Sequence, residues 1–384
     1  DQLDPFYARV EQRLGVAALP DAMEFDRVKV FAEGARKANL PPPAPLPLAL
    51  QPSCTRCGWC VPICAFGKKT TMAHTYLADA QRTGRLGILS NRKAAYIARI
   101  GTRYRVWFWR TDSVERDYHR VATGPIDARD ADIVVVAAGA IESPVLLERS
   151  LSAELPAGVE RLRDVPTRFL GKGLDGTGDF VQGGFVSQRV DGFKGSVMMS
   201  HIDLGDFVLE DIHAIPIAAA VTLGAQAAGV TKNWGSAYKA SFRDYGRHLL
   251  AIAIVGKQGT DRTIVVTDDN GNARVGGTAY QPAPGSLDAA RSIITALGGQ
   301  PIRTAWETDR RVFTVHPTGG CAMADGGDAV VRARDLQVQN NPGLYVIDGS
   351  VLPSSPLRNP AHTIAAIAER ALDVILGGSG AWPS

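Results

Sequence analysis

A histidine in a glycine-rich turn and an asparagine at the start of a helix are the residues of this chain best suited to chemistry. His316 lies within residues 315–321, ahead of a Pro-Thr-Gly-Gly-Cys run, and Asn359 precedes a proline and the helical pattern of residues 363–368. An imidazole, with an unperturbed pKa of about 6.5, can remove a proton near neutral pH. The glycines allow the backbone to approach a planar ring without a Cβ clash. The pattern therefore indicates proton transfer next to a flat molecule.

Both residues also have an ordinary structural explanation. A lone histidine in a turn is common, and asparagine followed by proline is a frequent way to begin a helix. The functional interpretation uses the same helix, because its N-terminus carries partial positive charge that can face an anionic group. One carboxamide oxygen, that of Asn359, cannot fully serve both the helix cap and a substrate.

Two apolar segments predict the strands that position these residues. Residues 133–139 form a continuous apolar run, which is typical of a strand buried on both faces of a parallel sheet, and lead into a helix over Pro144–Arg149. Residues 344–347 form a second run, which ends at Asp348 and Gly349. Because open α/β sheets bind ligands at the carboxyl ends of their strands, both segments predict a ligand site.

Together, the segments 315–321, 344–350 and 359–363 resemble the C-terminal signature of the glucose-methanol-choline (GMC) family of flavoenzymes, which oxidise alcohols. The Gly-Gly-Cys and Asp-Gly-Ser variants are most similar to the cholesterol oxidase branch. The resemblance implies an α/β fold that is α+β overall. It comprises a parallel-sheet FAD domain, incomplete in this sequence, and an antiparallel-sheet substrate domain.

The resemblance also implies a reaction and the residues that perform it. An alcohol, such as a sugar, a sterol or another ring alcohol, would be oxidised to the carbonyl, with hydride passing to FAD. His316 would be the catalytic base and Asn359 its partner on the substrate hydroxyl. The FAD contacts that the resemblance implies are Ala94, Ala138, Gly139, Ala140, Asp348, Gly349, Pro360, Ala361, His362 and Thr363.

One part of the family pattern is missing. No Gly-x-Gly-x-x-Gly element follows a strand near the start of the sequence, although such an element supplies the backbone N–H groups that hold a dinucleotide's pyrophosphate. The favoured explanations are that the chain is a fragment or that a second chain supplies this unit. A degenerate relative is the remaining alternative.

Four of the five cysteines lie close together, at Cys54, Cys57, Cys60 and Cys64. Thiolates at this spacing can converge on one metal centre, as in bacterial ferredoxins, although alanine stands where ferredoxins have proline. Cys54, Cys60 and Cys64 also resemble the segment of iron–sulfur glucose and fructose dehydrogenases that holds a three-iron cluster and passes electrons to a cytochrome. A 3Fe–4S cluster, or a 4Fe–4S cluster that includes Cys57, is one hypothesis. Structural or free thiols, zinc and disulfides are the alternatives.

The composition limits the class of protein. The chain of 384 residues has 45% hydrophobic and 21% charged residues, which are ordinary values for a globular protein. A net charge of +3 gives no argument for nucleic acid or an anionic membrane as a partner, and no apolar run is long enough to span a bilayer. No signal peptide is visible, so the sequence leaves a cytoplasmic and a periplasmic location open.

The order of the patterns predicts the domain organisation. Residues 1–71 hold a lead-in helix, a Pro-rich linker and the cysteine run, and residues 72–150 form part of the FAD domain. Residues 151–315 are expected to form the substrate domain, and residues 316–384 return to the FAD domain with the catalytic pair.

Shorter patterns predict individual elements. They are helices over Met72–Arg82 and Ser286–Leu297 and strands over Ile88–Ile100, Tyr104–Arg110, Leu249–Val255 and Thr263–Thr267. A substrate pocket is expected from residues 180–260, whose large apolar side chains suit ordinary core packing equally well. These side chains are Phe180, Phe185, Met198, Met199, Phe207 and Trp234.

Three functional hypotheses follow from these patterns. The first is an FAD-dependent alcohol dehydrogenase whose electrons leave through an iron–sulfur cluster to an external acceptor such as a cytochrome. The second is an alcohol oxidase of the same fold that uses oxygen and forms hydrogen peroxide. The third is a non-catalytic part that needs a partner chain to hold the flavin.

Overall fold

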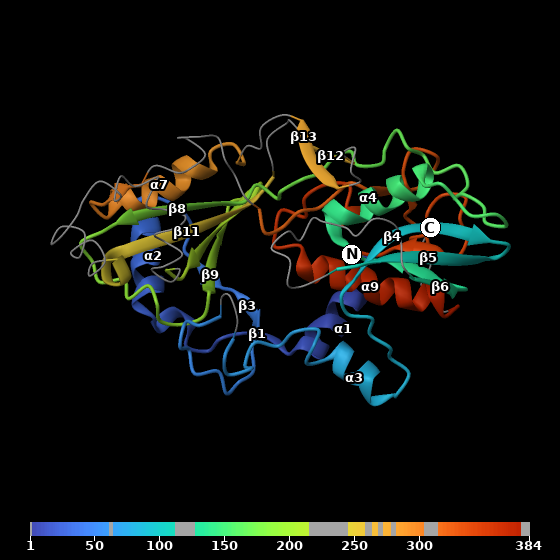
Figure 1. Ribbon diagram of the computed structural model, residues 1–384. Helices are drawn as coiled ribbons and strands as arrows, with labels where there is room; N and C mark the ends of the chain where they lie inside the picture. Colours follow the sequence, from blue (N-terminus) through green and yellow to red (C-terminus); the bar gives the residue numbers. More distant parts are fainter. Residues whose placement is uncertain are drawn as a thin grey trace.

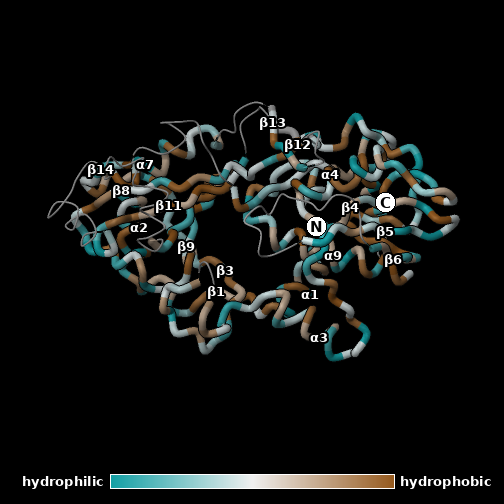
Figure 2. The backbone as a smooth tube through the Cα atoms, in the orientation of Figure 1, coloured by the Kyte–Doolittle hydropathy of each residue, from teal (hydrophilic) through white to brown (hydrophobic). Residues whose placement is uncertain are grey.

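The computed structural model describes residues 2–60, 64–111, 127–214, 245–257, 263–267, 272–277, 282–302 and 314–377. Within them the chain forms two lobes, one built around a six-stranded sheet and one around strands β4–β6 with two long helices (Figure 1). Hydrophobic stretches run through both lobes, as the hydropathy colours in Figure 2 show. No helix of these residues is both long enough and apolar enough to cross a membrane.

The longer described helices bury one face each, and α2 shows the pattern most clearly. In α2, Val28, Phe31 and Ala35 are fully buried, which is the spacing of one helix face. The α-helices span Asp4–Leu14 (α1), Asp26–Lys37 (α2), Tyr76–Arg82 (α3), Gly139–Ser152 (α4), Ser286–Ala296 (α7) and Ala361–Ile375 (α9). Two short 3-10 helices span Ala22–Glu24 (η1) and Gly349–Val351 (η3).

The six-stranded sheet has the order β14-β8-β11-β10-β9-β2, and every pairing in it is antiparallel. Its strands span Ala44–Pro45 (β2), Phe180–Phe185 (β8), Met198–Asp203 (β9), Phe207–Ile212 (β10), Leu249–Gly256 (β11) and Gln300–Pro301 (β14). Leu209, Ile252 and Ile293 share one buried cluster, so α2 and α7 cover the same face of the sheet. The antiparallel sheet that the resemblance implied is therefore confirmed.

The second lobe contains a three-stranded antiparallel meander and a short pair of parallel strands. Strands β4 (Arg92–Ile100), β5 (Arg103–Arg110) and β6 (Asp127–Ala131) are antiparallel, and β7 (Val134–Val136) lies parallel to β17 (Leu344–Val346). The remaining strands form small pairs: β1 (Val16–Ala18) with β3 (Pro47–Ala49), β12 (Thr263–Thr267) with β13 (Ala273–Gly277), and β15 (Met323–Ala324) with β16 (Val331–Arg332).

The predicted burial of the apolar run 133–139 on both faces is wrong for this structure. The strand and its parallel pairing are confirmed, but Ile133 and Val135 are 47% and 45% exposed, whereas Val136 is buried. Among the described strands β7 pairs only with β17, so one face and one edge of the pair are open.

Several predicted elements are correct with shifted limits. The hairpin of β4 and β5 is confirmed, while the helix expected from Met72 begins at Tyr76. The helix expected from Pro144 begins at Gly139 and therefore contains the proline. Trp234, expected in the pocket, lies outside the described residues.

A buried ion pair ties the N-terminal region to the six-stranded sheet. Arg27 Nε donates to Asp211 Oδ2 at 2.7 Å, and the two side chains are 1% and 0% exposed. The other guanidinium nitrogens of Arg27 donate to the carbonyls of Gly192, Lys194 and Ser196. Asp211 Oδ1 accepts from the backbone N–H groups of Met199 and Ser200 and from the Ser200 hydroxyl. Both charges are thus satisfied without water.

Replacing Asp211 by alanine would leave the Arg27 guanidinium buried without its counter-ion. We expect the Asp211→Ala substitution to lower the free energy of unfolding by about 3–5 kcal/mol, measured by urea denaturation followed by circular dichroism. Glu33→Ala, which removes an exposed ion pair with Lys37, is the control and should change stability little. A loss below about 1 kcal/mol for Asp211→Ala, the value of an exposed ion pair, would contradict the account.

Candidate active site

The imidazole of His316 is held by Asp179, a residue that lies far from it in the sequence. Its Nδ1 lies 2.8 Å from Asp179 Oδ1, and the two side chains are 15% and 10% exposed. The second carboxylate oxygen, Asp179 Oδ2, accepts from the Thr314 hydroxyl at 2.7 Å and from the Val315 N–H at 3.0 Å. A carboxylate with these partners requires the proton of neutral His316 on Nδ1, which leaves Nε2 as an acceptor.

The structure brings the second predicted catalytic residue to the opposite nitrogen. Asn359 Nδ2 lies 3.4 Å from His316 Nε2. Asn359 also hydrogen-bonds Glu210, a carboxyl group of β10 that is 1% exposed. Burial raises the pKa of Glu210 to about 7, against the opposing effects of His316 and of the bond from Asn359. Two carboxyl groups in different environments therefore flank one imidazole.

A backbone ladder fixes the turn that carries His316. Asp175 and Thr318 exchange two N–H to carbonyl bonds of 2.8 Å, and the Thr177 hydroxyl donates to the His316 carbonyl. Gly319 lies so close to this segment that an added Cβ would stand 2.1 Å from the carbonyl oxygen of Gly173. The glycine is therefore required for the close approach, and the segment before β8 sets the position of the imidazole.

Asp348 organises the predicted flavin contacts at the end of β17. Its Oδ2 accepts from the Gly139 N–H at 2.8 Å and from the Ser143 hydroxyl, and its Oδ1 accepts from the Ser350 N–H. Gly349 accepts from the Gly319 N–H, which joins this cluster to the catalytic turn. The structure thus brings Gly139, Asp348 and Gly349 next to the His316 segment.

The other predicted flavin contacts are spread over two elements. Ala94 lies at a bulge of β4, and its carbonyl accepts from Arg149 Nη2. Ala138 and Ala140 frame the start of α4, where Ala140 is buried. Their roles stay predictions.

Four more predicted contacts surround the start of α9. Pro360 is the N-cap residue, and no side chain caps this end of the helix. Ala361 is exposed. His362 and Thr363 face α1, since Tyr7 packs edge-on against the His362 ring and its hydroxyl lies 2.8 Å from Thr363 Oγ1. Helix α1 therefore covers one side of this helix terminus.

The four clustered cysteines do not converge in the described structure. Cys60 is buried with its thiol 3.8 Å from the Ser196 hydroxyl, Cys57 is exposed, and Cys54 and Cys64 are half-buried. Among the described residues no group of three or more Cys, His, Asp or Glu side chains could hold a metal ion. Cys321, the fifth cysteine, is fully buried beside the catalytic turn, and burial raises the pKa of its thiol.

Cys64 differs from the other cysteines in its electrostatic surroundings. Partial burial raises the pKa of its thiol, but four backbone N–H groups together outweigh this and hold the pKa below its usual value; they belong to Lys69, Lys68, Phe66 and Gly67. This is the environment of a stabilised thiolate at a turn.

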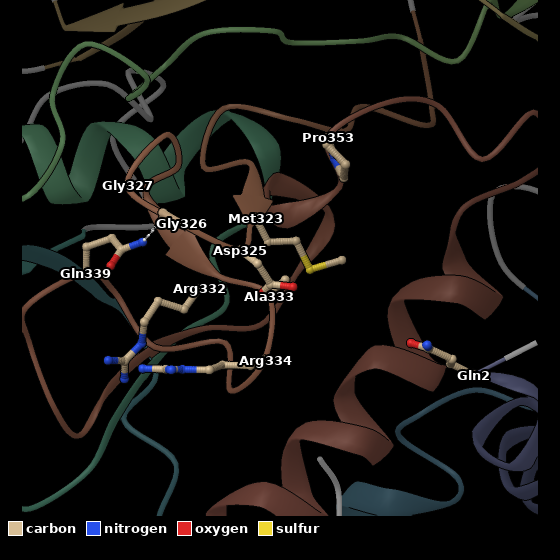
Figure 3. Close-up of a pocket in the computed structure, with 10 residues that line it drawn as sticks. All are labelled: Gln2, Met323, Asp325, Gly326, Gly327, Arg332, Ala333, Arg334, Gln339 and Pro353. Atoms are coloured by element: carbon tan, nitrogen blue, oxygen red, sulfur yellow. Dashed lines mark hydrogen bonds between the residues drawn. The ribbon is translucent and has the colours of Figure 1, made fainter. Parts of the chain in front are cut away.

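A surface hollow beside β15 and β16 lies apart from this chemistry. Arg332, Arg334 and Met323 line it on one side, with Gln2 across from them (Figure 3). None of its lining residues is a predicted catalytic or cofactor residue, so the hollow is separate from the candidate active site at His316.

Sequence reasoning missed Asp179 and Glu210. Asp179 is 137 positions from His316, and nothing in its surroundings marks it as a partner. Glu210 had a signal: Glu210 and Asp211 are two consecutive acidic residues within the apolar strand Phe207–Ile212. Buried carboxyl groups in a strand call for a partner, and here the partners are Asn359 and Arg27 respectively.

Comparison with known proteins decides the family. Two family models, both described as GMC oxidoreductase, match residues 1–158 and 233–368. This chain belongs to the GMC oxidoreductase family. The resemblance found in the sequence is therefore confirmed, and so is the α/β fold class that it implied.

Individual relatives agree with this assignment. A 2-methyl-1,2-propanediol dehydrogenase of Mycolicibacterium austroafricanum is 24% identical over 283 residues, 67% of this chain and 50% of that protein. A cholesterol oxidase of Acinetobacter baumannii is 42% identical over 80 residues, 21% of this chain and 14% of that protein. The chain thus spans half or less of the length of these relatives.

A solved structure shows the same fold. Pyridoxine 4-oxidase from Mesorbium loti superposes with a TM-score of 0.57 at 20% identity, over 92% of this chain and 70% of that chain. At this identity the likeness shows the fold alone.

The Asp179→Asn substitution should change the tautomer of His316. The Val315 N–H is an obligatory donor, so the carboxamide oxygen of the new asparagine must face it. The NH₂ group would then face Nδ1 and move the proton of the neutral ring to Nε2. Long-range ¹H–¹⁵N NMR of ¹⁵N-histidine-labelled protein reports this directly, because the chain has 7 histidines and His316→Gln assigns the signal. An unchanged Nδ1–H tautomer in Asp179→Asn would show that Asp179 does not set it.

Glu210 should make folding stability depend on pH. Its folded pKa of about 7 lies above the ordinary value of 4.5, so the folded state keeps a proton that the unfolded state has lost. The stabilisation is complete below the unfolded pKa and is lost as pH rises through the folded pKa. Between pH 5 and pH 8 we therefore expect wild type to lose about 2–3 kcal/mol of unfolding free energy relative to Glu210→Gln.

Urea denaturation at the two pH values measures this difference. Glu33→Gln is the matched control: the pKa of Glu33 lies below its ordinary value because of Lys37, so the group stays ionised throughout this range. Equal pH dependence in wild type and Glu210→Gln would contradict the assignment of a raised pKa to Glu210.

Proposed function

We propose that this chain forms the catalytic part of a flavin-dependent enzyme that oxidises an alcohol to a carbonyl compound. The observation that carries the proposal is the position of His316, between Asp179 at Nδ1 and Asn359 near Nε2. Membership of the GMC oxidoreductase family supports the same reaction class.

His316 is the proposed general base. With Nδ1 donating to Asp179, Nε2 carries the lone pair that takes the proton of the substrate hydroxyl. The Asp179 carboxylate then stabilises the imidazolium that forms. Asn359 Nδ2, 3.4 Å from Nε2, is in reach of the same substrate oxygen and would orient it. FAD, when bound, supplies the acceptor for the hydride that leaves the carbinol carbon.

The residues around the start of α9 fit the ring end of such a cofactor. This helix has 15 residues, and its first N–H groups have no side-chain cap, so its N-terminus offers positive potential and free donors. Gly139 has a positive φ of 84° and open space around its Cα, as expected where a flat ligand approaches the backbone. Pro360, Ala361 and Gly139 are therefore retained as proposed FAD contacts.

The pyrophosphate end of FAD requires a further unit. Residues 171–176 match the Gly-x-Gly-x-x-Gly spacing, but they form turns that lead to β8 and do not open a helix. We propose that the pyrophosphate is held by a separate strand–turn–helix segment, from a second chain or another part of a longer one. The open edge of β7, with Ile133 and Val135 exposed, supports the addition of a parallel strand there.

The names of relatives narrow the proposed substrate, whereas the electron acceptor stays open. The names of relatives, 2-methyl-1,2-propanediol dehydrogenase and cholesterol oxidase, support an alcohol with a branched or ring skeleton. Oxygen and a non-oxygen acceptor are both retained, and measuring hydrogen peroxide under air separates them. The iron–sulfur relay through Cys54, Cys60 and Cys64 has no support in the described geometry, so we leave it out of the reaction. Iron analysis of protein purified without air tests that decision.

The His316→Ala substitution should remove the general base. We expect the rate of flavin reduction by substrate, measured without air by stopped-flow absorbance, to fall by at least about a hundredfold. His74→Ala is the control, because His74 is an exposed histidine that bonds only its neighbour Thr71 among the described residues. Reduction of His316→Ala within about threefold of wild type, a factor worth under 1 kcal/mol, would refute the proposed role.

A further inference from the structure

Two polar side chains lie next to each other on the face of the six-stranded sheet opposite α2 and α7. Glu210 of β10 pairs directly with His201 of β9 across the antiparallel ladder. Leu209 and Ile202, their neighbours in the strands, belong to the core under α2 and α7. Because side chains alternate along a strand, Glu210 and His201 point to the opposite face.

Each of the two residues has a buried polar atom without a hydrogen-bond partner in the described structure. These atoms are Oε2 of Glu210 and Nδ1 of His201. Leaving a buried polar atom unpaired costs about 1–3 kcal/mol. One ligand can satisfy both atoms, because the two residues are directly paired.

The pair is adjacent to the catalytic residues. Glu210 hydrogen-bonds Asn359 and interacts electrostatically with His316. Across the other neighbouring strand, β11, the residue paired with Glu210 is Ala253, whose side chain is a single methyl group. A molecule whose hydroxyl group meets His316 can therefore extend over Glu210 and His201.

The chemistry of the two side chains suits a hydroxyl group. Burial lowers the pKa of His201, and the positive charge of Arg358 lowers it further, so the imidazole is a neutral acceptor near pH 7. Burial raises the pKa of Glu210 to about 7, well above that of an ordinary carboxyl group. Arg358 is paired with the carboxylate of Asp203, and a hydroxyl group can donate to either Glu210 or His201.

We infer that Glu210 and His201 form a subsite for a second hydroxyl group, so that the alcohol oxidised at His316 is a diol or a larger polyol. This inference rests on the proposed alcohol oxidation. It adds that the substrate is chosen by a polar group beyond the reacting carbon. A hydroxyl bound by buried acceptors gives strong selectivity, because an analogue without it leaves those acceptors unpaired.

The test compares two alcohols with the same carbon skeleton, 1,2-propanediol and 1-propanol. The holoenzyme is mixed with each without air, and the second-order rate constant of flavin reduction is measured. Wild type should prefer the diol by at least about tenfold, and Glu210→Gln and His201→Phe should each lower that preference by about tenfold or more. Glu33→Gln, an exposed glutamate of α2, should keep the wild-type ratio.

The outcomes separate the subsite from the proposed function. An unchanged diol preference in both Glu210→Gln and His201→Phe would overturn the subsite while leaving alcohol oxidation intact. A wild type that prefers 2-aminoethanol to 1,2-propanediol would overturn it as well, in favour of a cation. Flavin that neither alcohol reduces would instead overturn the proposed function, and this inference with it.

A binding measurement checks the subsite without turnover. In ¹⁵N-histidine-labelled protein, 1,2-propanediol should shift the ring nitrogen signals of His201, while 1-propanol at the same concentration should not. The His201→Phe variant identifies the signal. Equal shifts with both alcohols would contradict a subsite for the second hydroxyl group.

Discussion

The active site depends on the backbone ladder between residues 175–179 and 314–318. Asp175 and Thr318 pair through two hydrogen bonds, and the carboxylate at the end of the first segment holds the imidazole at the start of the second. The first segment continues directly into β8 of the six-stranded sheet, while the second continues past Gly319 to the Asp348 cluster. The ladder therefore joins the sheet that would carry the substrate to the lobe that would carry the flavin ring.

Two carboxyl groups near His316 have different surroundings, and we propose a different role for each. Asp179 accepts hydrogen bonds from three donors, which belong to His316, Thr314 and Val315. Glu210 is almost fully buried, and one of its oxygens has no partner in the described structure, so its pKa rises. The first is suited to hold a tautomer and balance a positive imidazolium, and the second to bind a neutral polar group.

Local patterns in the sequence predicted the elements that are stabilised by contacts between residues close together in the chain. The β4–β5 hairpin and helix α9 follow from periodicity and turn residues, and the motifs around His316 and Asn359 identified the family. That these two residues form the catalytic pair stays a prediction. Contacts across long stretches of chain, such as Asp179 with His316, left no local trace. The exposure of Ile133 and Val135 was missed because the burial of a strand depends on its neighbours, which its own residues do not encode.

The most direct test of the account is the visible absorption spectrum of the protein supplied with FAD, recorded without air before and after an alcohol is added. If His316 accepts the hydroxyl proton as the hydride leaves, the flavin bands should bleach while one carbonyl product forms per flavin. A protein that binds FAD but keeps its oxidised spectrum with diols and simple alcohols alike would contradict the central claim that this site oxidises alcohols.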